Sequence, residues 1–327
     1  MKKILGIDIG GTKFAVSIAN VSNDSIDILS RISFDSIENP KDIELSLFQK
    51  IDELLENLSL SSSDLSAIGI SCGGIIDSEN GIVITTPVLP QWLNVNLREI
   101  LSKRYNLSVY VLNDANACAV AEWKYGAGKG SDNMVFLTCG TGIGAGLILN
   151  GRLYEGIGGS AGEFGHMRAE CFGPVGCGKS GSYEGFCSGS GIASLAKTRA
   201  LELLQAGKKC SFCDSLSSIN QISAKSVADS ANAGDKVAIE IYETAGDFLG
   251  RGIAILIDLL NIEVVSIGSV FVRAENLLRP AMERAIAREA MAYPRSQCRI
   301  LPAGLGEKVG DYASVCVAID GLSKESK

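Results

Sequence analysis

A short apolar segment at the start of the chain runs directly into a polar turn that contains two glycines. The turn reads Asp8-Ile9-Gly10-Gly11-Thr12-Lys13. Paired glycines let the backbone fold tightly so that its N–H groups converge on one point, and converging N–H groups form a cradle for an anion. The Thr12 hydroxyl and the Lys13 ammonium add donors, and Asp8 can hold a water molecule on Mg²⁺. Taken alone, the turn fits a phosphate hairpin with its metal partner as well as a plain β-hairpin.

A second glycine-rich stretch, Thr138-Cys139-Gly140-Thr141-Gly142-Ile143-Gly144-Ala145-Gly146, lies between two apolar segments. Alternating glycines weaken an ordinary strand, so a close approach of the backbone to a ligand is the natural explanation. Thr138 and Thr141 offer hydroxyl donors, as Thr12 does in the first turn. Two such hairpins in the two halves of one chain resemble the arrangement in actin-like sugar kinases and Hsp70 ATPases, where both grip one nucleotide.

Length and composition limit the class of protein. A chain of 327 residues is too long for one ordinary core, so we expect two domains. The net charge of −7 and the pI near 5.0 argue against a nucleic-acid partner. The most apolar run, residues 253–260, is interrupted by Asp258 and too short to span a bilayer, and the first residues do not read as a secretory leader. We therefore expect a cytoplasmic protein without a membrane partner.

The ten cysteines are expected to be free thiols, because several lie inside apolar segments and a reducing compartment keeps them reduced. Cys210 and Cys213 have the spacing of a redox or metal-binding pair. No strand is expected before them and no second pair follows, so the spacing is weak support for such chemistry.

Hydrophobic periodicity predicts alternating strands and helices in both halves. The expected strands are residues 4–9, 14–20, 26–34, 67–72, 108–112, 133–138, 143–149, 152–154 and 264–267. The expected helices are residues 40–58, 95–105, 116–125, 190–206, 223–232, 235–260, 274–292 and 312–319. Each half opens with strand-loop-strand and continues with α/β units, which predicts an α/β fold of two duplicated lobes with a ligand cleft between them. We expect an N-terminal lobe of residues 1–114, completed by a C-terminal helix at 311–327, and a C-terminal lobe of residues 115–310.

One glycine-rich segment matches a motif only by its letters. Residues 173–180, Gly-Pro-Val-Gly-Cys-Gly-Lys-Ser, satisfy the Walker A pattern. A working P-loop needs a hydrophobic strand before it and a helix after it, and neither is predicted here. We therefore do not expect a P-loop nucleotide site in this segment.

The remaining polar candidates are Asn113-Asp114, Glu163, His166 and Glu184. Asp114 follows an expected strand, where α/β folds place ligand-contacting groups, but it could equally cap the next helix. His166 is the only histidine of the chain. The spacing of these residues does not by itself decide between structural and functional roles.

Seven motifs, in their order along the chain, resemble the ROK family of repressors, open reading frames and kinases. They are Asp8–Lys13, Gly73-Gly74, residues 89–95 (Leu-Pro-Gln-Trp-Leu-Asn-Val), Asn113–Asn116, Gly140–Gly146, Gly162–Met167 and Gly181–Ser190. The likeness runs from residue 4 to about residue 320. It implies an actin-like (ribonuclease H-like) ATPase fold with two lobes and a central cleft.

The resemblance also implies roles for particular residues. Asp114 would be the catalytic general base, because a sugar hydroxyl is a poor nucleophile until its proton is accepted. The implied sugar-binding residues are Gly74, Asn113, Asp114, Glu163, His166 and Glu184. The implied ATP-binding residues are Asp8, Gly10, Gly11, Thr12, Lys13, Thr138, Gly140, Thr141, Gly142 and Gly268, with Asp8 also holding Mg²⁺ through water.

The chain departs from the family pattern at a zinc-binding loop. Val175, Cys177 and Ser182 stand where zinc-bearing members have three cysteines. A structural zinc site needs four N or S ligands, so we expect none here, and the loop would be held by packing of Phe172, Tyr183 and Phe186. A rearranged site that recruits Cys171 or Cys187 to His166 and Cys177 is the alternative.

The resemblance implies an ATP-dependent hexose kinase, with glucose as the first expected substrate and a homodimer as the expected assembly. Two features leave details open. The adenosine loop reads Gly268-Ser269-Val270 in place of the common Gly-Gly-Gly, and Gly73-Gly74 resembles the N-acetylmannosamine kinases. An N-acetylmannosamine, N-acetylglucosamine or other hexose kinase is therefore the alternative. A transcriptional regulator is less expected, because only seven residues precede Asp8, and a non-catalytic sugar sensor is less expected because Asp8 and Asp114 are both present.

Overall fold

The computed structural model describes residues 2–22 and 24–325, apart from the side chain of Glu307. The chain forms two compact units. The first comprises Met1–Gly130, Gly146–Ala161 and Glu307–Lys327, and the second comprises Ser131–Ala145 and Gly162–Gly306. The lobe boundary expected from the sequence lies at residue 114. The units differ from that division because the helix after residue 114 packs on the C-terminal helix of the first unit.

A five-stranded sheet with the order β3-β2-β1-β4-β8 is the centre of the first unit. Its strands are β1 (Lys2–Ile9), β2 (Lys13–Val21), β3 (Ile26–Asp35), β4 (Ala67–Cys72) and β8 (Val109–Asn113). The first three form an antiparallel meander, whereas β4 pairs parallel to β1 and β8 pairs parallel to β4. The carboxyl ends of β1, β4 and β8 therefore lie at one edge, where Asp8 pairs with Ser71 and Cys72 pairs with Asn113.

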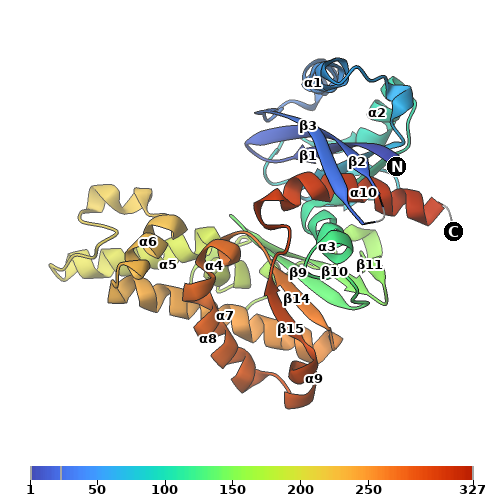
Figure 1. Cartoon of the computed structure of the whole chain (residues 1–327). Helices are drawn as coiled ribbons and strands as arrows, with labels where there is room; N and C mark the ends of the chain where they lie inside the picture. The colour runs from blue at the N-terminus through green and yellow to red at the C-terminus, as the bar shows by residue number, and fades with distance from the viewer. Residues whose placement is uncertain (1, 23, 326–327) are drawn as a thin grey trace. The chain divides into compact units, whose positions relative to one another are not determined.

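Helices cover both faces of this sheet. They are α1 (Ile43–Asn57), α2 (Leu97–Tyr105), α3 (Asp114–Tyr125) and α10 (Val309–Glu325). The buried stripe of α1 packs in one core with alternate residues of β1 and β4, such as Leu5 and Ile7. On the other face, α10 packs on β1, β4 and α3 (Figure 1). Gly69 has no side chain there, and an added Cβ would lie 2.0 Å from the Ser314 carbonyl oxygen.

A small antiparallel sheet follows β4 and was not expected from the sequence. It consists of β5 (Ile75–Asp77), β6 (Ile82–Thr85) and β7 (Leu93–Asn96). The helix expected from residue 95 begins instead at Leu97, because the Asn96 side chain accepts the Glu99 N–H and so caps α2.

The second five-stranded sheet repeats the strand order of the first, as β11-β10-β9-β14-β15. Its strands are β9 (Met134–Cys139), β10 (Ile143–Leu149), β11 (Arg152–Tyr154), β14 (Val264–Ile267) and β15 (Arg299–Pro302). β14 lies parallel to both β9 and β15. Strand β15 was missed in the sequence, since residues 299–302 offer only one four-residue run. The repeated order shows the duplication that the sequence predicted.

The helices of the second unit are built around one long pair. The elements are the hairpin β12 (Val175–Gly176) and β13 (Lys179–Ser180), and the helices α4 (Tyr183–Cys187), α5 (Gly189–Gln205), α6 (Ala224–Asn232), α7 (Lys236–Leu260), α8 (Val270–Glu289) and α9 (Ala292–Gln297). Gly246 and Gly250 let α7 approach α8 closely, since an added Cβ would lie 2.5 and 2.3 Å from carbonyl oxygens of α8. Helix α8 starts earlier than expected and is kinked at Ala274, where the expected helix began. Among the described residues, no helix is both long and apolar enough to cross a membrane.

Candidate active site

The Asp8–Lys13 turn is a hairpin closed by its own backbone. The Gly10 N–H donates to the Lys13 carbonyl oxygen at 3.1 Å, and a Cβ added at Gly10 would lie 2.8 Å from that oxygen. Thr12 and Lys13 are exposed at the tip. The turn therefore presents the exposed side-chain donors of Thr12 and Lys13 on a backbone that local contacts fix, as a phosphate cradle requires.

Asp8 lies at the end of β1 among other carboxylates of the first unit. Burial, followed by the nearby charges of Asp114 and Asp311, raises the pKa of Asp8 to about 7. Arg31 offsets part of this effect, and its Nε contacts Asp311 Oδ1 at 2.5 Å. A cation relieves repulsion between like charges, and Mg²⁺ keeps several waters and needs only one or two carboxylates. The residues around Asp8 therefore fit a magnesium ion.

Asp311 was not singled out in the sequence. It lies at the start of α10, far along the chain from Asp8, and no local motif marks it. The only available signal was the expected packing of a C-terminal helix against the first lobe.

The sequence left open whether Asp114 caps the next helix or contacts a ligand, and the structure gives the capping mainly to its neighbour Asn113. Asn113 caps α3, since its Oδ1 accepts the Ala115 N–H at 2.9 Å, and its Nδ2 donates to the Gly74 carbonyl oxygen. Asp114 is the first residue of α3, and its Oδ1 also accepts the Ala115 N–H. Its other oxygen, Oδ2, lies beside Gly73, where an added Cβ would be 3.4 Å away. Helix capping therefore uses Asn113 and at most one oxygen of Asp114.

The electrostatic setting of Asp114 suits a proton acceptor. The protein atoms around the carboxyl raise the pKa of Asp114 above its ordinary value, while backbone N–H groups at the start of α3 partly oppose this. The side chain is nevertheless exposed to solvent. The raised pKa and the exposure are compatible, because a carboxyl can have one solvent-accessible face while protein atoms replace much of the water around it. Asp114 is thus reachable and more basic than a free aspartate.

The backbone conformation and the surroundings of Gly74 allow only glycine at this position. Its φ is +114°, and an added Cβ would lie 2.3 Å from the Thr85 carbonyl oxygen. The bond from Asn113 to its carbonyl oxygen therefore links the ends of β4 and β8 through a residue that no larger side chain can replace.

The second glycine loop connects β9 and β10 in the second unit. Thr138 is half-buried and Thr141 exposed, and a Cβ added at Gly140 would meet only the Ser269 and Thr138 hydroxyls, at 3.7 and 3.8 Å. Gly140 thus lies beside open space, as the expected approach of a ligand requires. Gly146 has a different reason to be glycine: a Cβ there would lie 2.5 Å from the Ala119 Cβ of α3.

Gly268 and Ser269 follow β14 at the same end of the second sheet. The Gly268 N–H donates to the Leu137 carbonyl oxygen at 2.9 Å. Ser269 has φ +56° and ψ −115°, a conformation that glycine adopts far more readily. The structure therefore keeps the backbone of a glycine turn at the position where the sequence has serine.

His166 is the last residue of a 3₁₀ turn (Phe164–His166) that precedes the β12–β13 hairpin, and Glu163 lies directly before this turn. Both side chains are exposed, and the His166 N–H donates to the Glu163 carbonyl oxygen at 3.1 Å. Gly162, with φ +93°, lets the chain turn directly before them. Their polar groups are therefore accessible to a ligand.

Glu184 lies in α4 and uses both carboxylate oxygens on backbone donors of the second unit. Oε1 accepts the Cys177 N–H at 2.9 Å, and Oε2 accepts the Ile143 N–H at 3.2 Å. No sequence pattern predicts these contacts, because Ile143 is 41 positions from Glu184.

The three positions where zinc-bearing members have cysteines have different surroundings in the structure. Val175 is exposed, whereas Ser182 is buried and caps α4 by accepting the Gly185 N–H at 3.2 Å. Burial and the neighbouring Glu184 carboxylate raise the pKa of the Cys177 thiol to about 12. Cys171 is exposed and Cys187 is buried. Within residues 2–22 and 24–325, no three His, Cys, Asp or Glu side chains are grouped so that they could hold a metal ion.

The aromatic residues of this loop pack only in part as expected. Tyr183 stacks on Phe164, and Phe186 stacks on Phe248 with ring centroids 3.7 Å apart. Phe172 is 77% exposed, so the expectation that it packs in the loop was wrong. The backbone at Gly173 lies against the Phe186 ring, because an added Cβ there would be 2.4 Å from that ring.

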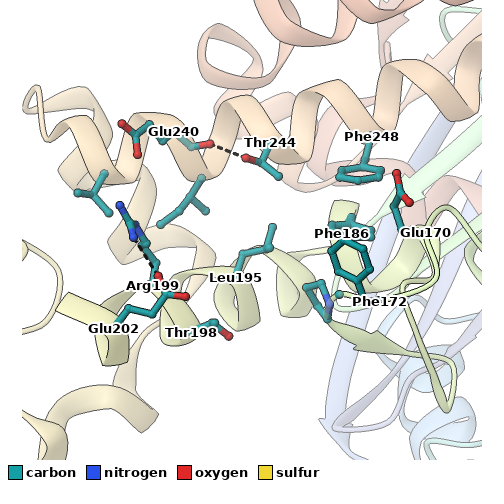
Figure 2. Close-up of a pocket in the computed structure, with 14 residues that line it drawn as sticks. Glu170, Phe172, Phe186, Leu195, Thr198, Arg199, Glu202, Glu240, Thr244 and Phe248 are labelled. Atoms are coloured by element: carbon teal, nitrogen blue, oxygen red, sulfur yellow. Dashed lines mark hydrogen bonds and ion pairs between the residues drawn. The ribbon is translucent and has the colours of Figure 1, made fainter. Parts of the chain in front are cut away.

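Phe172 instead lines a cavity of about 620 Å³ between α5 and α7 (Figure 2). Its walls are mostly apolar, with Phe186 and Phe248 at one end and Arg199, Glu202 and Glu240 toward the other. None of the expected site residues lines it, so this cavity is separate from the candidate active site.

Solved structures share this fold over nearly the whole chain. A ROK family glucokinase from Streptomyces griseus, in complex with glucose and AMPPNP, is 28% identical with a TM-score of 0.77, covering 98% of this chain and 100% of that one. A ROK family transcriptional regulator, a homologue of the E. coli MLC protein, is 26% identical with a TM-score of 0.83, covering 96% of this chain and 77% of that one. The duplicated sheets and these structures define an actin-like ATPase fold, which confirms the fold expected from the sequence.

Sequence comparison narrows the class to a family. A glucokinase from Thermotoga maritima is 36% identical over 292 residues, which are 87% of each chain. The ROK family model matches residues 4–318, and the chain belongs to this family.

Proposed function

We propose that the protein transfers the γ-phosphoryl group of ATP to a hydroxyl group of a hexose, with glucose as the first candidate. The observation that carries this proposal is the state of Asp114. It is accessible, its pKa is raised, and helix capping leaves its Oδ2 available beside Gly73. The relatives named glucokinase and the complex with glucose and AMPPNP support the same reaction.

In this proposal, Asp114 accepts the proton of the attacking hydroxyl as the phosphoryl group is transferred. Asn113, Gly74, Glu163, His166 and Glu184 hold the sugar, because carboxylates, an amide and an imidazole match the donors and acceptors of vicinal hydroxyls. Orientation of the reactive hydroxyl accounts for much of the rate, since positioned groups react as one molecule.

The phosphate-binding groups are the backbone donors, hydroxyls and ammonium of the two glycine loops. They are Gly10, Gly11, Thr12, Lys13, Thr138, Gly140, Thr141 and Gly142, with Gly268 beside the adenosine. Mg²⁺, held through water by Asp8, would neutralise charge on the phosphate oxygens. The neighbouring Asp311 keeps the surroundings of Asp8 acidic and so favours a cation there.

The decisive test replaces the proton acceptor without changing its shape. Asp114→Asn should lower kcat by roughly 10²–10⁴-fold with a small effect on hexose affinity. Coupled ADP release would be measured over glucose, mannose, fructose, allose and the N-acetyl hexosamines. Near wild-type turnover in the variant would show that Asp114 is only a helix-terminal residue.

The same screen of sugars identifies which hexose is the substrate. The pair Gly73-Gly74 resembles the N-acetylmannosamine kinases, and the N-acetyl sugars are therefore the alternative substrates. A kcat/KM higher for an N-acetyl hexosamine than for glucose would assign the protein to that activity.

A sugar-responsive regulator is the second candidate function, favoured by the TM-score of 0.83 to a ROK transcriptional regulator. The kinase is preferred because Asp8 and Asp114 are both in place in the first unit. Sugar binding without ADP release would support the regulator.

We also propose that the protein assembles as a homodimer, as ROK kinases commonly do. Ile255 and Leu259, one turn apart and exposed on α7, offer an apolar surface for such contact. Light scattering coupled to size exclusion would measure the mass, and a monomer at micromolar concentration would contradict the proposal.

For location we propose the cytoplasm. Buried thiols such as Cys72, Cys139 and Cys316 pack as small apolar side chains, which a reducing compartment preserves. Fractionation of cells that express the tagged protein would test this location.

A further inference from the structure

The carboxylate of Glu184 joins two loops of the second unit that are distant in sequence. One is the glycine loop between β9 and β10, which it contacts through the Ile143 N–H. The other is the turn of the β12–β13 hairpin, which it contacts through the Cys177 N–H. Each carboxylate oxygen accepts a hydrogen bond from one loop, so a movement of the carboxylate would shift both loops.

The chain is shaped on both sides for this contact. At Gly142, an added Cβ would lie 2.6 Å from Glu184 Oε2. Any larger residue would therefore displace the carboxylate from this position. Cys177 adopts φ +52°, a left-handed conformation that is uncommon for a residue with a side chain. This conformation turns its N–H toward Oε1.

The segment that begins with Glu184 also fixes the rest of the glycine loop. The Gly189 N–H donates to the Gly140 carbonyl oxygen at 2.8 Å, and the Ser190 Oγ donates to the Thr141 carbonyl oxygen at 2.7 Å. Glu184 differs from these two residues because it also reaches the Cys177 hairpin. It is therefore the member of the segment that can transmit a change between the two loops.

We propose that Glu184 is a positioning residue that couples hexose binding to the shape of the nucleotide loop, an inference that rests on the proposed function. A carboxylate oxygen accepts more than one hydrogen bond, so Glu184 can take a sugar hydroxyl while it keeps its backbone donors. A bound hexose then fixes the carboxylate, and the carboxylate fixes the Ile143 N–H and the loop behind it. The nucleotide consequently binds better to the sugar-loaded protein, and the sugar binds better to the nucleotide-loaded protein by the same factor.

The experiment measures the affinity of Mg·AMPPNP by calorimetry with and without a saturating amount of the hexose that the enzyme phosphorylates. For the wild type, we expect the hexose to tighten nucleotide binding by about fivefold or more. In Glu184→Gln, only one side-chain atom can accept, so one backbone donor loses its partner. The sugar-dependent tightening should then fall to near onefold, and the KM for ATP should rise together with the KM for the hexose.

Glu163→Gln is the matched control. Glu163 is also a proposed sugar ligand, but it is exposed. We expect this variant to weaken hexose binding and to keep the full tightening of nucleotide binding once hexose is saturating.

Gly142→Ala provides a second variant in which Glu184 is unchanged. Its added Cβ displaces the carboxylate, so it should also lose the sugar-dependent tightening. Circular dichroism and the thermal midpoint identify any variant that does not fold, and the remaining variant then gives the result.

Two results would overturn the inference. One is full tightening in Glu184→Gln at saturating hexose, which would make Glu184 a sugar ligand only. The other is a wild-type enzyme that phosphorylates the hexose without any tightening. If the wild type phosphorylates no hexose, the proposed function fails first and the coupling fails with it, which the turnover assay shows separately.

Discussion

The two glycine loops carry similar side chains but are held in different ways. The Asp8–Lys13 turn is closed by its own Gly10 to Lys13 hydrogen bond and is backed by the buried end of β1. The loop between β9 and β10 is held from outside, by Glu184, Gly189 and Ser190. The first loop is thus closed by its own residues and takes a bond from outside, from the Ser36 N–H to the Thr12 carbonyl oxygen at 3.2 Å. The second loop takes its bonds from a segment that lies 41 to 49 positions later in the sequence.

This difference indicates where each loop is sensitive. A loop that closes on itself should respond to changes of its own residues and keep its shape under distant changes. A loop that is held by tertiary contacts can respond to events elsewhere in its unit, which suits a loop whose affinity depends on a second ligand.

Between the two loops, the largest effect is expected at Asp8, the carboxylate behind the first loop. Asp8→Asn should lower kcat by roughly 10²–10³-fold, because a neutral amide no longer favours a hydrated cation beside the phosphates. Thr138→Ala, at the second loop, should cost about tenfold or less. ADP release at increasing Mg²⁺ would measure both, and an Asp8→Asn variant with more than half of the wild-type kcat would show that the carboxylate is structural.

A pair of alanine substitutions tests the steric difference directly. Gly10→Ala places a Cβ 2.8 Å from the Lys13 carbonyl oxygen and should lower the free energy of unfolding by about 1–3 kcal/mol. Gly140→Ala meets its nearest atoms at 3.7 Å and should change stability by less than about 0.5 kcal/mol while it weakens AMPPNP binding. Urea unfolding and calorimetry measure the two effects. Equal losses of stability would contradict the contrast between the loops.

The external support of the second loop is tested at Ser190. Ser190→Ala removes the 2.7 Å bond to the Thr141 carbonyl oxygen, and a net loss of about 1 kcal/mol corresponds to a roughly fivefold higher KM for ATP. Ser194→Ala is the matched control, since Ser194 donates within α5 to the Ser190 carbonyl oxygen and contacts no loop residue through that bond. An equal change in both variants would assign the effect to the helix.

The last difference concerns the dependence of stability on pH. The pKa of Asp8 is raised to about 7, above the value near 3.9 of an unfolded chain. Its contribution to stability is therefore fully present below about pH 4 and is lost as the pH rises through 7. Without Mg²⁺, the wild-type Tm should fall more than that of Asp8→Asn between pH 5 and 8. Parallel curves for the two proteins would show that Asp8 does not titrate in this range.

The sequence predicted those features that rest on neighbouring residues. Both glycine loops, the buried stripe of α1 and the duplicated strand pattern follow from local periodicity and turn chemistry. The contact of Glu184 with Ile143 did not, because the two residues are 41 positions apart and no spacing rule joins them. The place of Asp311 near Asp8 was missed for the same reason, since it depends on where the last helix packs. The role of Phe172 failed because aromatic character does not show on which side of Gly173 a ring will lie.

The packing of α10 on Gly6 and Gly69 also affects how the protein is made. Those two glycines sit in strands that leave the ribosome early, whereas α10, which packs over them, begins only at Val309. At typical elongation rates the face of β1 and β4 waits on the order of ten to fifty seconds for its cover. During that interval the nascent first unit exposes a surface that α10 later covers. Premature termination shortly before Val309 would therefore leave this surface permanently open, and such fragments should be strong clients of chaperones and proteases.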